Sequence, residues 1–305
     1  MTISLKDRVA VVTGAGGGLG RSHALMLASR GAKVVVNDLG GGLDGTGSSS
    51  AAADRVVAEI EAAGGTAVPN YDSISEESGA AALIDTAIKQ FGRIDILVNN
   101  AGFLRDKTFA KADMADFRAV VGVHFLGAVY CTSAAFGHMR QQKHGRIVMT
   151  SSGAGLYGNF GQSNYGAAKM ALVGLMNVLK QEGARDNVLI NTIAPIAATR
   201  MTEAMMPPAA LPHLKAEAVS SAVTYLSSDE CTVSGHVISA GAGYFARAAM
   251  MEGAGVFMDD ADAADPDAVA AAYERIADLS HAEPFASAPD YITKALARFE
   301  PAETH

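Results

Sequence analysis

Seven short apolar runs alternate with helix-length segments along most of this chain. The runs span Arg8–Gly14, Lys33–Asp38, Thr66–Asp72, Ile94–Gly102, Gly145–Ser152, Val188–Pro195 and His236–Gly243. Between them, apolar residues recur at three- and four-residue spacing over Ala51–Ala63, Glu76–Phe91, Met114–Gln141 and Asn164–Glu182. Parallel neighbours need a crossover connection, and right-handed crossovers place helices on both faces of a sheet. The pattern therefore predicts an α/β, doubly wound, Rossmann-type fold with a parallel seven-stranded sheet.

The alternation ends after Gly243. The acidic segment Met258–Ser280 predicts one helix and Ser287–Phe299 predicts another, with no strand between them. We therefore expect a dinucleotide-binding and catalytic domain over residues 1–243 and a helical C-terminal extension over residues 244–305.

Composition argues against several classes of partner. The chain has 305 residues and a net charge of -8 without a basic run, so we expect neither a nucleic-acid partner nor binding to an anionic membrane. Cys131 and Cys231 fit neither a metal-ligand spacing nor a disulfide framework, so no metal site is expected. No segment approaches the ~18 apolar residues of a membrane span, and neither end resembles a secretory or peroxisomal signal. The expected location is cytoplasmic.

The first strand is followed by a glycine-rich turn, "VVTGAGGGLGRSHAL". Gly14, Gly18, Leu19 and Gly20 lie where this strand passes into a helix. In that position a tight turn lets the backbone approach a pyrophosphate, which the positively polarised helix N-terminus attracts. The turn predicts a dinucleotide site, although a glycine-rich turn without a ligand is the alternative.

The second strand ends at Asp38. A carboxylate there can accept hydrogen bonds from the adenosine ribose and repel a 2′-phosphate, which favours NAD over NADP. No arginine or lysine lies in the glycine turn or directly after Asp38 to bind such a phosphate. The alternative is a purely capping aspartate. Asp72, which ends the third strand, is predicted to meet the adenine edge or simply to begin a loop.

Further motifs follow in a fixed order. They are T-G-x-x-x-G-x-G at Thr13–Gly20, "NNAG" at Asn99–Gly102, Ser152, Tyr165-x-x-x-Lys169 and P-x-x-x-T at Pro195–Thr199. Together they resemble the short-chain dehydrogenase/reductase family. Longer stretches such as "GRIDILVNNAGFLRDK" are similar to the (3R)-hydroxyacyl-CoA dehydrogenase region of multifunctional beta-oxidation enzymes, nearly to the end of the chain. The length leaves no room for the hydratase or sterol-carrier domains of those enzymes.

The resemblance implies further cofactor contacts. The residues implied to lie beside the dinucleotide are Asn99, Ala101, Gly102 and Pro195. Thr199 resembles the family residue that contacts the carboxamide group of the nicotinamide. Tyr165 and Lys169 are implied to contact the dinucleotide as well.

Tyr165, Lys169 and Ser152 form a candidate catalytic set. Alcohol oxidation needs a base, and a tyrosine with a pKa near 10 is a poor base at neutral pH. Lys169 shares a helix face with Tyr165, so its ammonium and the positively charged nicotinamide of NAD are expected to lower the pKa of the phenol. Ser152 follows the fifth strand and is expected to hydrogen-bond the substrate oxygen. The alternative for Tyr165 and Lys169 is an ordinary pair on a helix surface.

One position departs from the usual family pattern. His124 lies where many members carry an asparagine that supports a water relay from the lysine. We expect a supporting catalytic role for His124, with a satisfied core histidine as the alternative.

The substrate is expected to be an apolar alcohol. Tyr157, Asn159 and Phe160 are predicted to form the wall of the substrate cleft, with simple packing as the alternative. Met201 lies in a methionine-rich segment punctuated by prolines, which is typical of an adaptable lid. The resemblance places (3R)-3-hydroxyacyl-CoA first and a 17β-hydroxysteroid second. Candidate anchors for CoA phosphates are Arg105, Lys107, Arg200 and Lys215, with ordinary solvated surface charges as the alternative.

Two further expectations concern assembly and activity. By resemblance the helices over Met114–Gln141 and Asn164–Glu182 pack against a twofold mate, which predicts a homodimer or homotetramer. A non-catalytic NAD-binding regulator is a remote alternative, because such a protein is expected to lose part of the catalytic set.

Overall fold

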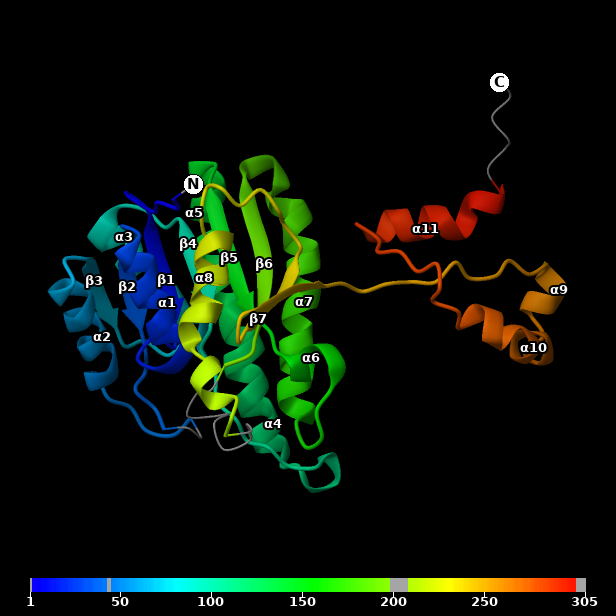
Figure 1. Ribbon diagram of the computed structural model, residues 1–305, viewed down its shortest axis with the longest axis horizontal. Coiled ribbons are helices and arrows are strands. Elements are labelled where there is room, and N and C mark those ends of the chain that lie inside the picture. The colour runs from blue at the N-terminus through cyan, green and yellow to red at the C-terminus, as the bar shows by residue number, and fades with distance from the viewer. Residues whose placement is uncertain (1, 43–44, 198–207, 300–305) are drawn as a thin grey trace. The chain divides into compact units, whose positions relative to one another are not determined.

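The computed structural model describes residues 2–42, 45–197 and 208–299, and the chain divides into the compact units Met1–Arg247 and Ala248–His305 (Figure 1). The first unit is built on one sheet, whose strands have the order β3-β2-β1-β4-β5-β6-β7-β8. The strands are β1 (Val9–Thr13), β2 (Lys33–Asn37), β3 (Thr66–Asn70), β4 (Ile96–Asn99), β5 (Gly145–Thr150), β6 (Val188–Pro195), β7 (Val237–Gly241) and β8 (Tyr244–Ala248).

Strands β1 to β7 run parallel, as the alternation predicted. Every residue of β1 and β5 is buried, because helices cover both faces of the sheet and leave no side for polar side chains. The strand order reverses between β1 and β4, so a crevice forms at the carboxyl ends of these strands. The doubly wound Rossmann-type fold is therefore confirmed.

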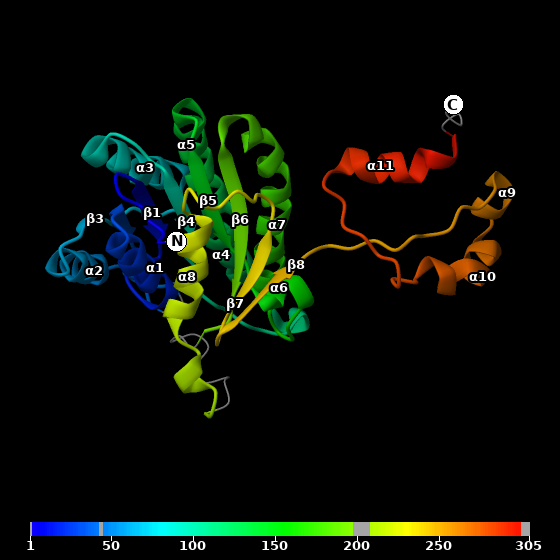
Figure 2. The same cartoon turned by 45° about the horizontal axis from the view of Figure 1, so that its top comes forward.

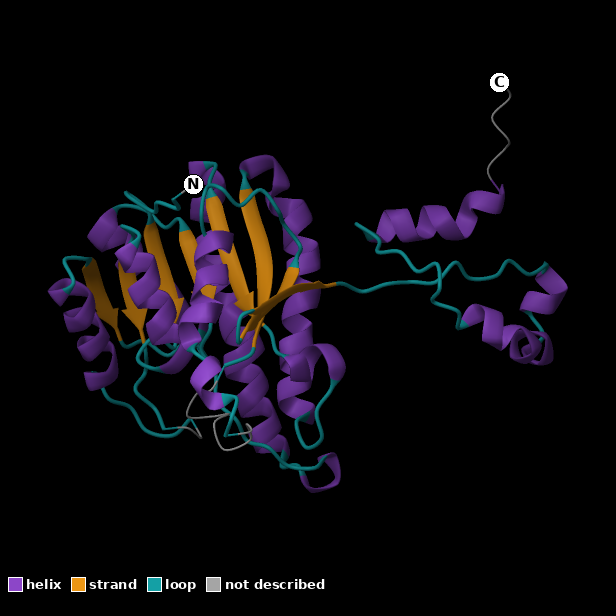
Figure 3. Ribbon diagram, in the orientation of Figure 1, coloured by secondary structure: helices purple, strands orange, loops and turns teal. Residues whose placement is uncertain are grey.

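Two layers of helices enclose the sheet (Figures 1 and 3). The helices are α1 (Gly18–Ser29), α2 (Ala51–Ala62), α3 (Glu77–Phe91), α4 (Met114–Val121), α5 (Gly127–Gln142), α6 (Gly153–Tyr157), α7 (Ser163–Gly183) and α8 (Ala216–Leu226). Helix α1 packs against α2 and α8 in one layer, whereas α3 packs against α5 and α4 against α7 in the other.

An eighth strand extends the sheet beyond the seven expected. The chain reverses after β7 at Ala242 and Gly243, which have φ angles of 51° and 76°. Positive φ at both central residues is typical of a two-residue hairpin turn, and a connection this short joins antiparallel strands. The sheet therefore acquires an antiparallel edge strand where the sequence suggested only the start of an extension.

The helix expected over Met114–Gln141 is interrupted. A π-helical turn, η2 (Gly122–Leu126), lies between α4 and α5. An 18-residue stretch within Met114–Gln142 has a mean hydropathy of 1.6, so on length and composition alone this segment could cross a membrane, contrary to expectation. Its buried residues, among them Val120, Cys131 and Met139, pack within the first unit, which is typical of the core helix of an α/β domain.

In its described part, up to residue 299, the second unit contains the α-helices α9 (Asp260–Ala263), α10 (Pro266–Ile276) and α11 (Ala288–Leu296) (Figure 2). The single helix expected over Met258–Ser280 is divided, because the Asp265 side chain caps a new helix that begins at Pro266. Backbone hydrogen bonds join Glu252 and Glu283.

A buried histidine makes the first unit sensitive to acid. His23 on α1 is fully buried against α8, where its Nδ1 lies 2.8 Å from the Ser220 hydroxyl, and burial lowers its pKa to about 3. The unfolded chain binds a proton near pH 6.5, so the free energy of unfolding should fall as the pH falls from 6.5 towards 3.

The substitution His23→Gln should reduce this pH dependence. By pH 4.5 the wild-type histidine costs about 2–3 kcal/mol, which a residue that does not titrate avoids. Urea unfolding at pH 7 and pH 4.5 measures the difference, with the exposed His138→Gln as the matched control. An unchanged pH dependence in His23→Gln would contradict the prediction.

Candidate active site

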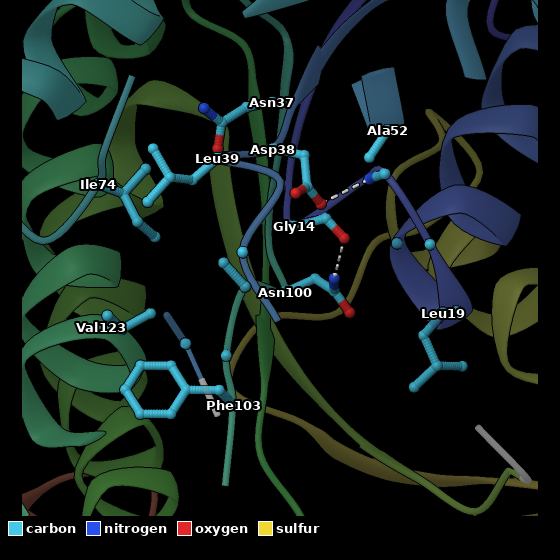
Figure 4. Close-up of a pocket in the computed structure, with 18 of the residues that line it drawn as sticks. Gly14, Leu19, Asn37, Asp38, Leu39, Ala52, Ile74, Asn100, Phe103 and Val123 are labelled. Atoms are coloured by element: carbon cyan, nitrogen blue, oxygen red, sulfur yellow. Dashed lines mark hydrogen bonds between the residues drawn. The ribbon is translucent and has the colours of Figure 1, made fainter. Parts of the chain in front are cut away.

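A pocket of about 550 Å³ opens at the carboxyl ends of the strands and connects the glycine turn to the predicted catalytic residues (Figure 4). It is lined by most of the predicted site residues, namely Gly14, Gly18, Leu19, Gly20, Asp38, Asp72, Ala101, Gly102, His124, Ser152, Tyr165, Lys169 and Pro195. Segments far apart in the sequence therefore share one cavity.

The glycine turn between β1 and α1 has the geometry that a dinucleotide requires. Gly14 has a φ angle of 63°, and a Cβ there would lie 2.7 Å from the Cα of Ala101. The Asn100 side chain donates to the Thr13 and Gly14 carbonyls at 3.0 and 3.2 Å and so holds the turn in place (Figure 4). No side chain caps the N-terminus of α1, so its first N–H groups can bind an anion. The turn therefore fits a pyrophosphate.

Asp38 and Asp72 follow β2 and β3 and line the pocket on the side away from Tyr165. Asp38 accepts the N–H groups of Gly16 and Gly40, each at 2.7 Å. An ionised carboxylate has about four acceptor positions, so two remain for ribose hydroxyls. The carboxylate of Asp72 is held by the Asn70 amide at 2.7 Å. This end of the pocket therefore suits an adenosine.

Ser152, Tyr165 and Lys169 come together at the ends of β5 and α7. Ser152 caps α6, and its hydroxyl accepts the Ala154 N–H at 3.1 Å. Tyr165 and Lys169 lie one turn apart on α7, with the Lys169 Nζ 5.6 Å from the centre of the Tyr165 ring. Lys169 donates to the Thr150 carbonyl at 2.6 Å, which fixes the lysine at the end of β5. The set can bind an alcohol oxygen and move its proton.

Burial changes the proton affinities of this set in a way that the sequence did not indicate. The pKa of Tyr165 is raised, mainly by burial, while the Ser152 hydroxyl acts in the opposite direction. Burial also lowers the pKa of Lys169 to about 7, so its ammonium is not permanently charged near neutral pH. A positive charge bound in the pocket would add to the partly charged Lys169 in favouring the phenolate.

His124 lies in the π-helical turn and contacts this set. Its ring packs edge-on against Tyr165 with centroids 5.1 Å apart, and its Nε2 lies 2.7 Å from the Phe103 carbonyl oxygen. Burial lowers the pKa of His124 to about 3, and the nearby Lys169 acts in the same direction. The Nδ1 atom is buried without a hydrogen-bond partner in the described residues. Gly102 must stay small, because a Cβ there would lie 1.9 Å from the His124 ring.

Several predicted residues lie outside this pocket. Asn99 points away from it and donates to the Thr132 hydroxyl at 3.0 Å. Tyr157 and Phe160 are 75% and 88% exposed, and the Asn159 amide donates to Gln162 at 3.0 Å. Thr199 and Met201 lie outside the residues that the structure describes.

Two of the four possible CoA anchors pair with an acid, whereas Arg200 lies outside the described residues. Arg105 and Lys107 both pair with Asp116, at 3.0 and 3.3 Å. Their charges are therefore partly balanced within the protein, and neither residue lines the pocket.

Other pocket residues were missed by sequence reasoning. They include Asn37, Leu39, Arg55, Ile74, Asn100, Phe103, Val123 and Thr150. Asn100 follows Asn99 in the "NNAG" motif, so its signal was present but assigned to the neighbouring residue. Arg55 lies in a helix, away from every motif, and only the fold brings it to the pocket.

Comparisons with known proteins agree with this geometry. A family model described as short chain dehydrogenase matches residues 8–209. The chain is 54% identical to the peroxisomal multifunctional enzyme A of Dictyostelium discoideum over 260 residues, which are 85% of this chain and 58% of that protein. It is 48% identical to the peroxisomal hydratase-dehydrogenase-epimerase of Saccharomyces cerevisiae over 302 residues, which are 96% of this chain and 33% of that protein. The chain thus spans between one third and three fifths of these relatives.

Two solved structures are similar as well. The full-length peroxisomal multifunctional enzyme type 2 of Drosophila melanogaster superposes with a TM-score of 0.82 at 39% identity, over 97% of this chain and 50% of that one. A 7α-hydroxysteroid dehydrogenase complexed with NADH and a bile-acid ketone gives a TM-score of 0.71 at 29% identity, over 79% of this chain and 95% of that one.

The comparisons overturn the cytoplasmic location expected from the sequence. The relatives from Dictyostelium, yeast and Drosophila all carry peroxisomal names. The expectation depended only on recognising no targeting signal, which is weaker evidence than similarity to proteins of another compartment.

Proposed function

The chain belongs to the short-chain dehydrogenase family, and from this premise we propose that it oxidises (3R)-3-hydroxyacyl-CoA to 3-oxoacyl-CoA with NAD. One observation carries the proposal: a single pocket joins a nucleotide-binding glycine turn to Ser152, Tyr165 and Lys169. The named multifunctional relatives support the acyl-CoA substrate.

NAD fits the described residues better than NADP does. The glycine turn suits the pyrophosphate, and Asp38 presents a carboxylate where NADP would carry its 2′-phosphate. A nicotinamide held near Tyr165 and Lys169 would accept the hydride and contribute a positive charge. We assign Ala101, Gly102 and Pro195 to this end of the site, and Thr199 and Asn99 as further cofactor-binding residues.

The chain's own residues then move the proton. Ser152 donates a hydrogen bond to the substrate oxygen as this oxygen becomes a carbonyl. The Tyr165 phenolate accepts the hydroxyl proton, and Lys169 stabilises that phenolate from the next turn of α7. We propose that His124 supports the set through its edge-on contact with the Tyr165 ring.

A steroid alcohol is the second candidate substrate. The similarity to a 7α-hydroxysteroid dehydrogenase favours it, since that protein carries the same fold. A 17β-hydroxysteroid has no phosphates, and neither Arg105 nor Lys107 lines the pocket to bind them. We propose that Tyr157, Asn159 and Phe160 contact the substrate whichever alcohol is used, and we assign Met201 to substrate contact as well.

We also propose that the chain forms a homodimer or homotetramer through α5 and α7. Apolar side chains of α7 and of the turn before α5 are accessible in a single copy, with Val178 53% and Leu126 38% exposed. Burying such residues against a twofold mate is the usual use of an apolar helix face.

Initial rates of NADH formation test the substrate assignment. We expect kcat/KM for a (3R)-3-hydroxyacyl-CoA to exceed the value for the (3S) epimer and for estradiol by at least about tenfold, which corresponds to 1.4 kcal/mol of transition-state binding. A higher value for estradiol would favour the steroid assignment. NADH binding without turnover of any of these alcohols would favour the non-catalytic regulator.

A further inference from the structure

The adenosine end of the pocket contains a positively charged side chain, Arg55, which donates a hydrogen bond to a backbone carbonyl group. Arg55 lies in the second turn of α2 and lines the pocket, and its Nη2 donates to the Gly16 carbonyl at 3.1 Å. The neighbouring acidic residues of α2 have other partners: Asp54 accepts a hydrogen bond from the Tyr71 hydroxyl, and Glu59 forms an ion pair with Arg21. A guanidinium has five N–H donors, so Arg55 has donors left for a ligand.

Arg55 and Asp38 approach the same part of the glycine turn. A Cβ on Gly16 would lie 2.7 Å from the Ala52 Cβ and 2.8 Å from the Asp38 carboxyl carbon. The start of α2, the glycine turn and Asp38 are therefore in close contact, and Figure 4 shows Asp38 directed towards the turn and Ala52 beside it. Gly16 thus donates its N–H to Asp38 while its carbonyl accepts from Arg55.

The Asp38 carboxylate occupies a site that is built for an anion. Two backbone N–H groups, from Gly16 and Gly40, point at its oxygens, and Arg55 adds a positive charge at the same corner. Backbone N–H groups arranged in this way bind carboxylates and phosphates alike. A neutral side chain at position 38 would leave these donors for another anion.

We propose that Arg55 is a cofactor-specificity residue. With Asp38 present, Arg55 holds the glycine turn through Gly16, and the carboxylate repels a 2′-phosphate on the adenosine ribose. Without the charge of Asp38, Arg55 and the N–H groups of Gly16 and Gly40 bind that phosphate. The inference rests on the proposed NAD site. It attributes the preference for NAD to the Asp38 carboxylate, because Arg55 already supplies a cation that could bind a 2′-phosphate.

Fluorescence titration with NADH and NADPH tests this inference without any alcohol substrate. The variants are Asp38→Asn and Asp38→Ala, each with and without Arg55→Gln. We expect Asp38→Asn to tighten the NADPH Kd at least about tenfold relative to the wild type. Adding Arg55→Gln should then raise the NADPH Kd on the order of tenfold, as expected for loss of a charge-assisted hydrogen bond. The NADH Kd should change by less than about threefold.

The matched control is Arg21→Gln in the Asp38→Asn background, because Arg21 pairs with Glu59 and does not line the pocket. It should leave the NADPH Kd within about twofold. An NADPH Kd that is the same with and without Arg55→Gln in both Asp38 variants overturns the inference while leaving the NAD assignment intact. A wild-type protein that binds NADPH more tightly than NADH overturns both.

Discussion

Tyr165→Phe should lower kcat by roughly 10³-fold, as expected when a positioned proton acceptor is lost. The substitution removes one hydroxyl group and keeps the ring that packs against His124 with centroids 5.1 Å apart. The fold and the adenosine end of the pocket should therefore be unaffected. Measurements of kcat and of the NADH Kd separate the two effects, and we expect the NADH Kd to change by less than about threefold.

Tyr157→Phe is the matched control, since it removes the same hydroxyl from a tyrosine outside the pocket. Tyr157 is 75% exposed and has no lysine one helical turn later. Its kcat should stay within about twofold of the wild type, although a substrate contact would raise KM. Substantial turnover by Tyr165→Phe would refute the assignment of the base, whichever alcohol is used.

The sheet could be predicted because its physical signal is local. A parallel strand covered on both faces is apolar throughout, so "VAVVT" in β1 is recognisable without knowledge of its neighbours. Strand β8 gives no such signal: Tyr244 and Phe245 are exposed, and the strand follows β7 without a helix between them. Its existence depends on a two-residue turn, which the periodicity of apolar residues does not report.

The candidate site was predictable where its residues are neighbours in sequence. The glycine turn and the Tyr165-Lys169 pair each lie within one turn or loop, so local geometry determines their arrangement. Asn99 and Asn100 show the limit, because adjacent residues at the end of a strand point to opposite sides. One reaches Thr132 and the other the glycine turn, and the sequence did not distinguish them.

Arg55 and the proton affinities depend on tertiary structure. The pocket includes Arg55 only because α2 packs beside the glycine turn, which a motif search limited to the turn and to the end of β2 does not sample. The pKa of Lys169 likewise follows from its burial, which helical spacing alone does not report. Contacts between distant segments therefore account for most of what the sequence did not predict.

Lys169→Met should abolish most turnover and yet stabilise the protein. The variant loses the cation that stabilises the Tyr165 phenolate, so kcat should fall at least about a hundredfold. In the wild type, burial lowers the pKa of Lys169 from 10.5 to about 7, which means that the folded state disfavours the ammonium. An apolar chain of similar length avoids this cost, and the gain at pH 7 should be about 2 kcal/mol after the loss of the hydrogen bond to Thr150.

The pH dependence of the free energy of unfolding separates this effect from general repacking. Between pH 7 and 10.5 the unfolded wild type binds a proton at Lys169 that the folded protein has released, so this group makes stability rise with pH. The advantage of Lys169→Met should therefore shrink by pH 9.5. Lys180→Met on the same helix is the control for replacing a lysine by methionine, because Lys180 is only partly buried. The prediction fails if the variant is no more stable than the wild type, or if the difference between their free energies of unfolding stays constant over this pH range. Either result would mean that burial does not lower the pKa of Lys169.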